Sequence, residues 1–539
     1  MDEDKRLPVL IVGAGPTGLT TAIELARRGV GVRIVDAAPG PRDWARATVV
    51  HGRTLEIFES LGIAEAELGR GVRSKGVNFY SRGAQTSRMD FESVASRYPF
   101  ELMISEEETE AILRSRLAVE GVETEWDLSL VDFTRDARSV RCLFQRADES
   151  QEIVHATWLV GCEGWDSRTR RLLGESFDGF DYEHEWAVLD CRLEGWPLAD
   201  DEATVFLEHE GLVFLPLPGG RWRVYFRPAG AKSDLEADVR RGLEVHLPGV
   251  TMRDVGSQAR FRAGNRIVEG YRHGQVFLAG DAAHVCSPIE GHGLNTGIQD
   301  AHNLAWKLSL VETGVCADIL LESYDAERRP VADAIRASGD EAERNQQLRD
   351  PRQIVRRDTE MVAVDHDPLA SRHRAEATSE LVATYRGSPI VGGDPPPRYR
   401  AAAAGDRLPE AGTVTAPGGS DVDVHQLTHR TTHTLLCLVR GAPDEATVEA
   451  LRLVDAVARE NPDLVGASFV VCDEPTADPD LAPVWHRAGA PTVFDTLGVD
   501  SPTLLLVRPD RFVALRTNEV DASRVETYVA ELRQGRVSG

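Results

Sequence analysis

Hydrophobic positions are spaced in different ways along this chain of 539 residues, and each spacing predicts a different element. Residues 7–13 form an almost unbroken apolar run, as in a strand that is buried on both faces of a parallel sheet. From residue 18 to residue 28 the apolar positions recur at helical spacing, and a second apolar run covers residues 30–36. The three segments predict one strand–helix–strand unit with parallel strands, because the helix carries the chain back to the same edge of the sheet.

The pattern changes between about residue 177 and residue 267. Short alternating runs at 203–206, 212–217 and 221–227 are separated by turns rich in glycine, which predicts an antiparallel sheet. Residues 295–345 contain few glycines and carry an apolar stripe, so we expect them to be helical.

The last part of the chain is predicted to form a separate domain. A Gly-Gly-Asp-Pro-Pro-Pro run at 392–397 favours a linker. The elements predicted beyond it are strands at 434–439, 468–472, 503–507 and 512–516 and helices at 444–460 and 522–533. Their order resembles a thioredoxin-like domain. A Cys-x-x-Cys pair is missing, which favours a structural or docking role over redox chemistry.

Composition narrows the class of protein. The 61 Lys and Arg against 87 Asp and Glu give a net charge of −26, which disfavours nucleic acids and anionic membranes as partners. Seven scattered cysteines favour neither a disulfide framework nor a structural zinc site, and we expect no metal. The charged amino terminus leads directly into a strand, and no apolar run approaches the roughly 20 residues of a membrane span. We therefore expect a cytoplasmic protein.

A glycine loop follows the first predicted strand. It reads Gly13-Ala14-Gly15-Pro16-Thr17-Gly18 and fits the G-x-G-x-x-G motif of dinucleotide binding between a strand and a helix. Gly13 permits the tight turn, Gly15 lets the backbone approach a pyrophosphate, and Gly18 allows the helix to pack closely on the strand. The start of the helix supplies N–H donors to the phosphates. Asp36, at the end of the second strand, is predicted to accept hydrogen bonds from ribose hydroxyls. This motif alone does not separate NAD from FAD.

A second loop lies near the middle of the chain and indicates which dinucleotide binds. Asp281 closes an apolar strand, where its carboxylate is placed to bond a ribityl or ribose hydroxyl. Pro288, Gly291 and Gly293 then lead into a predicted helix. Backbone amides at that helix start would face a phosphate or the flavin O2, where negative charge builds on reduction. The pair of loops therefore favours FAD.

With these loops, two further segments resemble the single-component (group A) FAD-dependent aromatic hydroxylases, which share the para-hydroxybenzoate hydroxylase fold. One segment is Tyr324-x-x-Glu327-Arg328-Arg329-Pro330, and the other is Gly161-Cys162-Glu163-Gly164-x-x-Ser167-x-x-Arg170. The overall sequence pattern is most similar to that of bacterial polyketide hydroxylases with a thioredoxin-like tail.

The resemblance implies an α/β fold in which a Rossmann-type FAD-binding domain carries an inserted antiparallel-sheet substrate domain and a C-terminal thioredoxin-like domain. The expected boundaries are 1–176 for the first FAD-binding part (with an excursion into the substrate domain near 72–105), 177–267 for the substrate sheet, 268–391 for the second FAD-binding part and 398–539 for the tail.

The loops and the resemblance together predict a set of cofactor contacts. The predicted cofactor-binding residues are Gly13, Gly15, Pro16, Thr17, Gly18, Asp36, Arg46, Glu106, Asp281, Pro288, Gly291, Gly293, Leu294 and Asn295. Arg46 resembles the arginine that the family lays along the flavin, and Glu106 stands where the family has a glutamine. The chain also departs from the family pattern at Glu163, which replaces an aspartate, at Ser287, which replaces a proline, and at His292, which fills a variable site.

The resemblance also implies a reaction. NADPH or NADH binds transiently and reduces the bound FAD, the reduced flavin captures O2, and a flavin C4a-hydroperoxide hydroxylates an electron-rich ring. The expected substrate is a phenolic or quinonoid metabolite of polyketide type, as in antibiotic biosynthesis. Baeyer–Villiger oxygenation and epoxidation by the same fold, and a non-catalytic flavin scaffold, remain open.

The predicted substrate contacts are aromatic residues of the antiparallel sheet, namely Phe214, Trp222, Tyr225 and Phe226. His209, His284 and Tyr225 are conceivable bases for a phenol, and nothing in their spacing selects one.

Replacing Asp281 by alanine is expected to weaken FAD binding by about 2 kcal/mol, because a charged hydrogen-bond acceptor is lost. Titration of the apoprotein with FAD, followed by flavin fluorescence, measures this change. Unaltered FAD affinity in Asp281→Ala would contradict the assignment of this residue to the cofactor.

Overall fold

The computed structural model describes residues 6–44, 47–208, 210–398, 401–416, 419–428, 431–473, 484–487 and 493–535. The chain divides into two compact units, each assembled from three segments. Unit 1 comprises Met1–Ile23, Gly31–Ala301 and Ala332–Leu381, and unit 2 comprises Glu24–Val30, His302–Val331 and Val382–Gly539.

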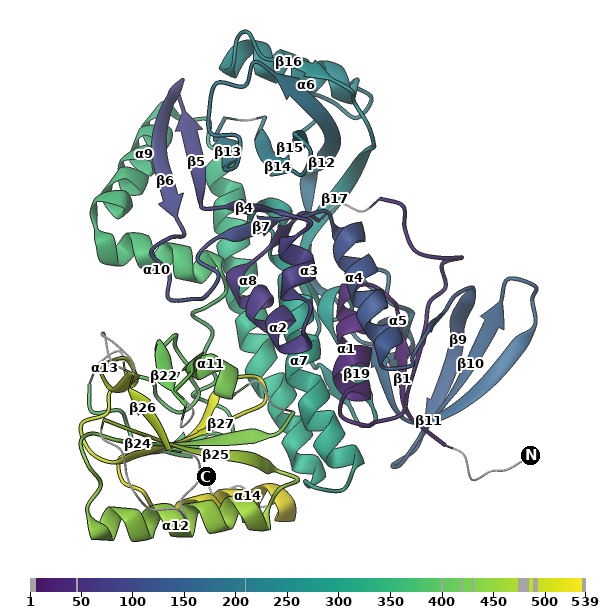
Figure 1. Ribbon diagram of the computed structural model, residues 1–539. Helices are drawn as coiled ribbons and strands as arrows, with labels where there is room; N and C mark the ends of the chain where they lie inside the picture. Colours follow the sequence, from purple (N-terminus) through teal and green to yellow (C-terminus); the bar gives the residue numbers. More distant parts are fainter. Residues whose placement is uncertain are drawn as a thin grey trace. The chain divides into compact units, whose positions relative to one another are not determined.

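One sheet of unit 1 has eight strands, five of which run parallel to one another (Figure 1). Its parallel strands, in spatial order, are β19 (Val276–Leu278), β11 (Gln151–Gly161), β1 (Leu7–Val12), β2 (Val32–Val35) and β8 (Thr124–Glu125). Helix α1 (Pro16–Ala26) connects β1 to β2, which confirms the predicted strand–helix–strand unit. The antiparallel strands β9 (Leu128–Arg135), β10 (Val140–Arg146) and β18 (Arg272–His273) extend the same sheet.

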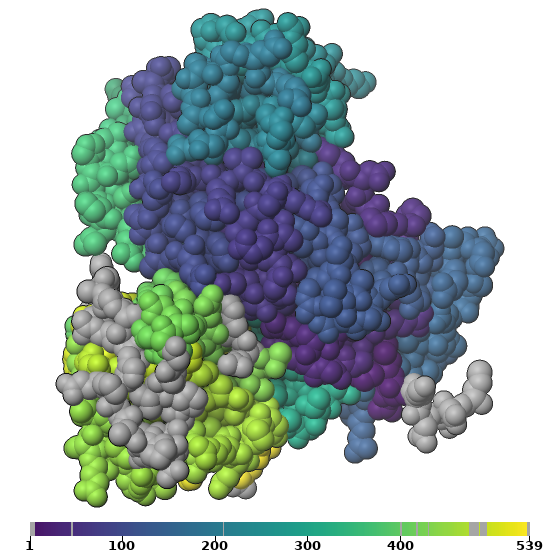
Figure 2. Space-filling view, viewed as in Figure 1, coloured from purple at the N-terminus to yellow at the C-terminus, as the bar shows by residue number. Residues whose placement is uncertain are grey.

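The second sheet of unit 1 has nine strands and is antiparallel except where β13 pairs with β5. Its strands are β5 (Gly76–Ser81), β6 (Ala84–Asp90), β12 (Asp178–Glu194), β13 (Ala203–Phe206), β14 (Val213–Leu217), β15 (Arg221–Phe226), β16 (Thr251–Arg253), β17 (Gln258–Ile267) and β20 (His284–Val285). The three alternating runs of the sequence are thus strands β13, β14 and β15. Figure 2 shows residues 177–267, which supply most of its strands, as a teal lobe that adjoins purple and blue residues of unit 1.

Helices and a small sheet complete unit 1. The small sheet consists of β3 (Val49–Val50), β4 (Val72–Ser74) and β7 (Glu101–Met103). The shorter helices are α2 (Gly52–Leu61), α3 (Ala64–Leu68), α4 (Glu106–Val119), α5 (Arg168–Leu173), α6 (Leu235–His246), η1 (Gly280–Ala282) and η2 (Pro288–Glu290). Helix α6 packs on one face of the nine-stranded sheet through Val239 and Leu243.

The stretch predicted as helical is formed by α7 (His292–Glu312) and α8 (Glu322–Gln346), with the short η3 (Asp318–Leu321) between them. Two helices that the sequence analysis did not predict follow, α9 (Pro351–His366) and α10 (Pro368–Thr378). Within the described ranges, no helix combines the length and the apolar character that crossing a bilayer requires.

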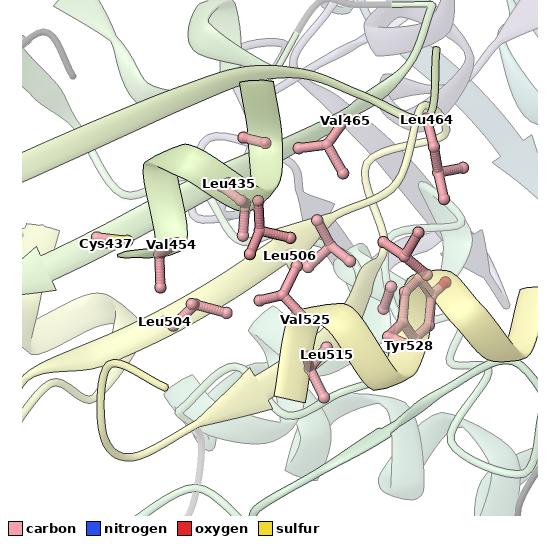
Figure 3. Packing of buried hydrophobic residues seen from close by; sticks show 14 of the residues in the cluster. Leu435, Cys437, Val454, Leu464, Val465, Leu504, Leu506, Leu515, Val525 and Tyr528 are labelled. Carbon is pink, nitrogen blue, oxygen red and sulfur yellow. The ribbon is translucent and has the colours of Figure 1, made fainter. Parts of the chain in front are cut away.

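The C-terminal part of unit 2 is built on a sheet of eight strands. In spatial order these are β21 (Gly392–Gly393), β28 (Val513–Thr517), β27 (Thr503–Val507), β24 (His433–Val439), β25 (Val465–Cys472), β26 (Val484–Arg487), β22 (Thr413–Thr415) and β23 (Asp421–Asp423). The helices are α11 (Val424–Leu427), α12 (Glu445–Glu460), α13 (Val493–Leu497) and α14 (Ala522–Gln534). One face of the sheet packs against α12 and α14 in an apolar core that includes Leu435, Val454 and Leu506 (Figure 3).

The predicted linker at 392–397 is wrong in its first part. Gly392 and Gly393 pair with Leu515 and Arg516 of β28, so this segment is a strand at the sheet edge. The backbone of Gly393 has a φ of 116°, and a Cβ there would lie 2.0 Å from the carbonyl oxygen of Arg516. Gly393 is therefore needed for close backbone approach, whereas a prediction from composition alone takes the glycines as a sign of flexibility.

A buried network of charges lies within unit 2. Arg508 contacts Glu327 at 2.6 Å and Asp510 at 2.5 Å, and Lys307 contacts Glu327 at 2.7 Å. The side chains of Arg508, Glu327 and Lys307 have no exposed surface. Burial alone would raise the pKa of Glu327, but Arg508 and Lys307 hold it well below its ordinary value. The carboxylate is therefore ionised, and it joins helix α8 to the C-terminal sheet.

Replacing Glu327 by alanine is expected to lower the free energy of unfolding by about 3–5 kcal/mol, because two buried cations lose their carboxylate. The matched control is Glu449→Ala, which breaks the exposed pair with Arg452 and is expected to cost less than about 1 kcal/mol. Urea denaturation followed by tryptophan fluorescence measures both. Equal stability of the two variants would contradict the importance of the network.

Candidate active site

Three distant segments of the chain meet at one edge of the parallel sheet. Strands β1, β11 and β19 are parallel neighbours, so the residues that follow them emerge side by side. The amide of Cys162 donates to the carbonyl of Val12 at 2.7 Å, and the amide of Ala279 donates to Gly161 at 3.1 Å. Both predicted glycine loops and the Gly161–Arg170 motif therefore lie together.

The glycines of the first loop have two different roles. A Cβ on Gly13 would lie 2.3 Å from the carbonyl oxygen of Cys162, and a Cβ on Gly18 would lie 1.9 Å from that of Gly13. These two positions permit close packing of backbone on backbone. A Cβ on Gly15 would meet nothing within 4 Å, so this glycine borders open space. Next to the first turn of α1, that space suits a phosphate group.

Asp36 supports the first loop from the end of β2. Its carboxylate accepts hydrogen bonds from the amide of Ala14 at 2.7 Å and the amide of Ala38 at 2.8 Å. An ionised carboxylate has about four lone-pair sites, so further donors such as ribose hydroxyls can be bound at the same group.

The second loop packs directly on the first. Added Cβ atoms on Gly280 and Gly297 would lie 2.5 Å and 2.4 Å from the hydroxyl oxygen of Thr17. The two glycines thus make room for Thr17 between the loops. A Cβ on Gly293 would have the Asp281 carboxylate, 3.9 Å away, as its nearest neighbour. Gly293 therefore also borders open space, and Asp281 is exposed beside it.

Asn295 holds the second loop in place through its side chain. Its Oδ1 accepts from the amide of His51 at 2.9 Å, and its Nδ2 donates to Val49 at 2.9 Å and to Gly291 at 2.8 Å. Asn295 is fully buried, so its side chain fixes the loop and does not extend toward a ligand. Before it, Pro288 starts η2, Gly291 ends it with a φ of 71°, and Leu294 is partly exposed.

Glu106 makes a reciprocal pair with the backbone of residue 47. Its carboxylate accepts from the amide of Ala47 at 3.1 Å, and its own amide donates to the carbonyl of Ala47 at 3.1 Å. The carboxylate therefore anchors the backbone at Ala47. Arg46, predicted to lie along the flavin, and His209, a conceivable base, lie outside the described residues.

Glu163 is partly buried and supports the first turn of helix α5. Its carboxylate accepts from the hydroxyl of Ser167 at 2.9 Å and the amide of Thr169 at 2.8 Å. Burial raises the pKa of Glu163, although these hydrogen bonds oppose the shift. Arg170, from the same helix, donates to the carbonyl of Ala282 at 3.0 Å and so ties the motif to the second loop.

The predicted substrate residues lie on opposite faces of the nine-stranded sheet. Phe214, Trp222 and Phe226 belong to the apolar core between the sheet and α6. Tyr225 lies on the other face, because successive side chains of a strand alternate. There it packs with Tyr182, Trp186, Phe261 and Ile289, and its hydroxyl lies 2.8 Å from that of Thr48.

The face that carries Tyr225 also carries Arg223, which the sequence analysis did not single out. Arg223 is buried and binds both carboxylate oxygens of Asp190, at 2.8 Å and 2.9 Å. It also donates to the carbonyl of Ala47 at 3.0 Å, while Trp44 donates to Asp190 at 3.0 Å. Alternation within the run at 221–227 places Arg223 with Tyr225, and this is the signal that identifies it.

The remaining conceivable base, His284, is engaged elsewhere. It is buried, and its Nε2 lies 2.6 Å from the carboxylate of Asp300, which also accepts from the amide of Gly280 at 3.1 Å. His284 thus supports the second loop. Among the described residues, Tyr225 is the candidate base on the face of the nine-stranded sheet opposite α6.

Known proteins share this architecture. The family model described as FAD binding domain matches residues 6–338. Pentachlorophenol 4-monooxygenase of Sphingobium chlorophenolicum is 33% identical over 84% of this chain and 84% of its own length. The 12-dehydrotetracycline 5-monooxygenase/anhydrotetracycline 6-monooxygenase of Streptomyces rimosus is 32% identical over 94% of this chain and 95% of its own. A solved ternary complex of aklavinone-11 hydroxylase with FAD and aklavinone has a TM-score of 0.77 and 23% identity, covering 99% of this chain and 100% of that one.

The two roles of the loop glycines predict opposite behaviour for two variants. Gly15→Val fills open space, so the apoprotein is expected to keep its stability and to bind FAD at least about tenfold more weakly, a loss of about 1.4 kcal/mol. Gly18→Ala forces a Cβ onto the carbonyl of Gly13, so it is expected to destabilise the apoprotein by about 1–3 kcal/mol.

Thermal unfolding of each apoprotein and titration with FAD separate the two effects. A Gly15→Val variant that is unstable without FAD, or that binds FAD normally, would contradict the assignment of the open space to the cofactor.

Proposed function

We propose that this protein, which belongs to the FAD binding domain family, hydroxylates a phenolic or quinonoid substrate of polyketide type. It is a flavin-dependent monooxygenase of the aromatic hydroxylase class, and the proposal proceeds from that class. The observation that carries the proposal is the convergence of both glycine loops at one sheet edge, in the same unit as the aromatic face around Tyr225. The similarity to a tetracycline-type monooxygenase over 94% of the chain supports the polyketide class.

The donors and open spaces at the sheet edge fit FAD. Gly15 and Gly293 border space that a side chain would fill, and each stands at the start of a helix whose free amides favour anionic groups. We assign the pyrophosphate to the start of α1, a ribose to Asp36 and the ribityl chain to Asp281. When bound, FAD supplies the electrons taken from NAD(P)H and activates O2.

The start of α7 has an electrostatic role in this proposal. Its amides carry partial positive charge and, with the Asn295 side chain fixing the loop, they form a rigid donor set. Because the flavin gains negative charge at its N1/O2 edge on reduction, such donors stabilise the reduced form.

We assign the aromatic substrate to the face of the nine-stranded sheet that carries Tyr225. The partly exposed rings of Tyr225 and Phe261, which pack on the buried Tyr182 and Trp186, offer apolar surface to a planar molecule. Burial raises the pKa of Tyr225, so its hydroxyl holds a proton at neutral pH and can donate it in a hydrogen bond to a substrate oxygen. The buried Arg223–Asp190 pair holds the neighbouring backbone of residue 47 and excludes water from this side.

We also propose that residues 398–539 form a thioredoxin-like domain with a structural role, and that the other boundaries expected from the sequence apply. The order β25-β24-β27-β28, with β24 and β25 parallel and the other neighbours antiparallel, supports this assignment. The described cysteines of this region, Cys437 and Cys472, are buried within its apolar cores and the sheet, which favours structure over redox chemistry.

Tricyclic and tetracyclic phenols such as anhydrotetracycline are expected to stimulate NAD(P)H oxidation by the FAD-loaded protein, with one oxygen atom from O2 entering the product. Mass spectrometry after reaction in ¹⁸O2 measures the incorporation. A ring-expanded lactone as product would indicate Baeyer–Villiger oxygenation in place of hydroxylation, and an epoxide would indicate epoxidation. The absence of bound FAD would contradict the proposal as a whole.

Tyr225→Phe is expected to lower kcat/KM for a phenolic substrate by on the order of tenfold, the effect of one hydrogen bond, at unchanged FAD occupancy. The matched control is Tyr80→Phe on β5, which makes the same chemical change in the apolar core near α6 and is expected to leave kcat/KM unaltered. Equal effects of the two variants would contradict the choice of this sheet face.

A further inference from the structure

A cluster of five ionisable residues, which we name the His292 cluster, lies behind the second glycine loop, with four members buried and Glu290 partly exposed. Its members are His51, Glu101, Glu290, His292 and Glu380, all in unit 1. His51 is fully buried, and His292 and Glu380 are 3% and 5% exposed. Nitrogen or oxygen atoms of His51, His292 and Glu380 lie within 4.8 Å of one another. The sequence analysis noted only His292, because the other members come from distant segments.

Contacts between the members are short and specific. Nδ1 of His292 lies 2.8 Å from the carboxylate of Glu380, and its Nε2 lies 3.6 Å from that of Glu290. On the other side, Nδ1 of His51 lies 2.9 Å from the carboxylate of Glu101. The centroids of the two imidazole rings are 5.1 Å apart, and the ring planes are tilted by 50°.

Neighbouring polar groups fix the carboxylates of the cluster. Glu380 also accepts hydrogen bonds from Thr296, at 3.2 Å, and from Gln299, both on α7. Glu290 accepts from the hydroxyl of Ser338 on α8 at 2.8 Å. The cluster therefore joins the start of α7 to η2, to α8 and to the segment that follows α10.

The charges in the cluster favour a proton on each ring nitrogen of His292. Three carboxylates face two imidazoles in a region with little solvent, and Asp281 lies close to the same loop. Burial would lower the pKa of His292, but hydrogen bonds to Glu290 and Glu380 raise it to about 10. The separation of 2.8 Å between Nδ1 and the Glu380 carboxylate is that of a hydrogen bond. The carboxylates on both sides of the ring and the raised pKa together favour the imidazolium form of His292 at neutral pH.

The position of this cation in the chain gives it a role. His292 is the first residue of α7 and stands between Gly291 and Gly293, the loop that we assign to the flavin. Its side chain points into the protein, so it does not occupy the ligand side of the loop. A unit charge fixed there adds to the partial charge of the helix start.

We propose that His292 is a positioning residue whose imidazolium, held between Glu290 and Glu380, locks the second loop and raises the reduction potential of the bound cofactor. This inference rests on the proposed FAD site. Because reduction adds negative charge near the start of α7, a positive charge behind the loop favours the reduced form and negative charges disfavour it.

The test compares the midpoint potential of bound FAD in two variants of opposite sign. His292→Gln removes one positive charge and is expected to lower the ratio of reduced to oxidised flavin at fixed potential on the order of tenfold, about 30 mV for a two-electron couple. Glu290→Gln removes one negative charge, keeps an acceptor for Ser338, and is expected to raise the potential. A loss of loop structure alone would move both variants in the same direction.

The pH dependence supplies a second readout. His292 is charged below its raised pKa, so the difference in potential between the wild type and His292→Gln is expected to shrink as the pH rises through about 10. Glu290, Glu380 and His51 with Glu101 are the titratable groups that face His292 from the elements packed on it.

Three results would overturn the inference, and they are distinguishable from failure of the proposed function. Unshifted potentials with normal FAD occupancy, or shifts of the same sign in both variants, would exclude the electrostatic role alone. A stoichiometric divalent metal found by elemental analysis of the purified protein would replace the proton as the charge in the cluster. Absence of FAD binding in the wild type would instead overturn the proposed cofactor site.

Discussion

Close backbone approach at one sheet edge is the constraint on which the site depends. Thr17 lies between Gly280 and Gly297, and Gly13 lies against the carbonyl of Cys162, at separations that no Cβ tolerates. Since β1, β11 and β19 are parallel neighbours, their ends must share one edge, and the glycines allow three loops to occupy it together. The starts of α1 and α7, the carboxylate of Asp36 and that of Asp281 take their places from this packing.

Local sequence carried enough information to predict this part of the molecule. A glycine loop between a strand and a helix has its geometry set by φ angles and by chain direction, and both are readable from neighbouring residues. The strands at 203–206 and 503–507 were predicted with the bounds of β13 and β27, because alternation or an apolar run ends sharply at turn residues there. The prediction from local composition was wrong at Gly392–Gly393, where the glycines take part in strand pairing and do not form a flexible linker.

Local sequence did not predict which face of a sheet meets a neighbouring helix, or which distant residue pairs with a buried charge. Alternation separates Tyr225 from Trp222, but it does not say which face meets α6 and which faces the rest of unit 1. The pair of His292 with Glu380 joins positions that are 88 residues apart, and Glu327 with Arg508 joins positions 181 apart. Buried charges find partners through the tertiary fold, so a single sequence shows them only as ordinary polar residues.

Unit 2 combines helix segments with the C-terminal sheet, and this bears on how independent the C-terminal tail is. Residues 302–331 belong to the same compact unit as residues 382–539, and Trp306, Leu310 and Leu320 share the core of Leu435 and Leu506. In this chain the tail therefore shares its core with the helices beside it and does not begin as a separate body at the Gly-Pro segment. A chain ending there would expose the apolar side of those helices and leave the ionised Glu327 without Arg508.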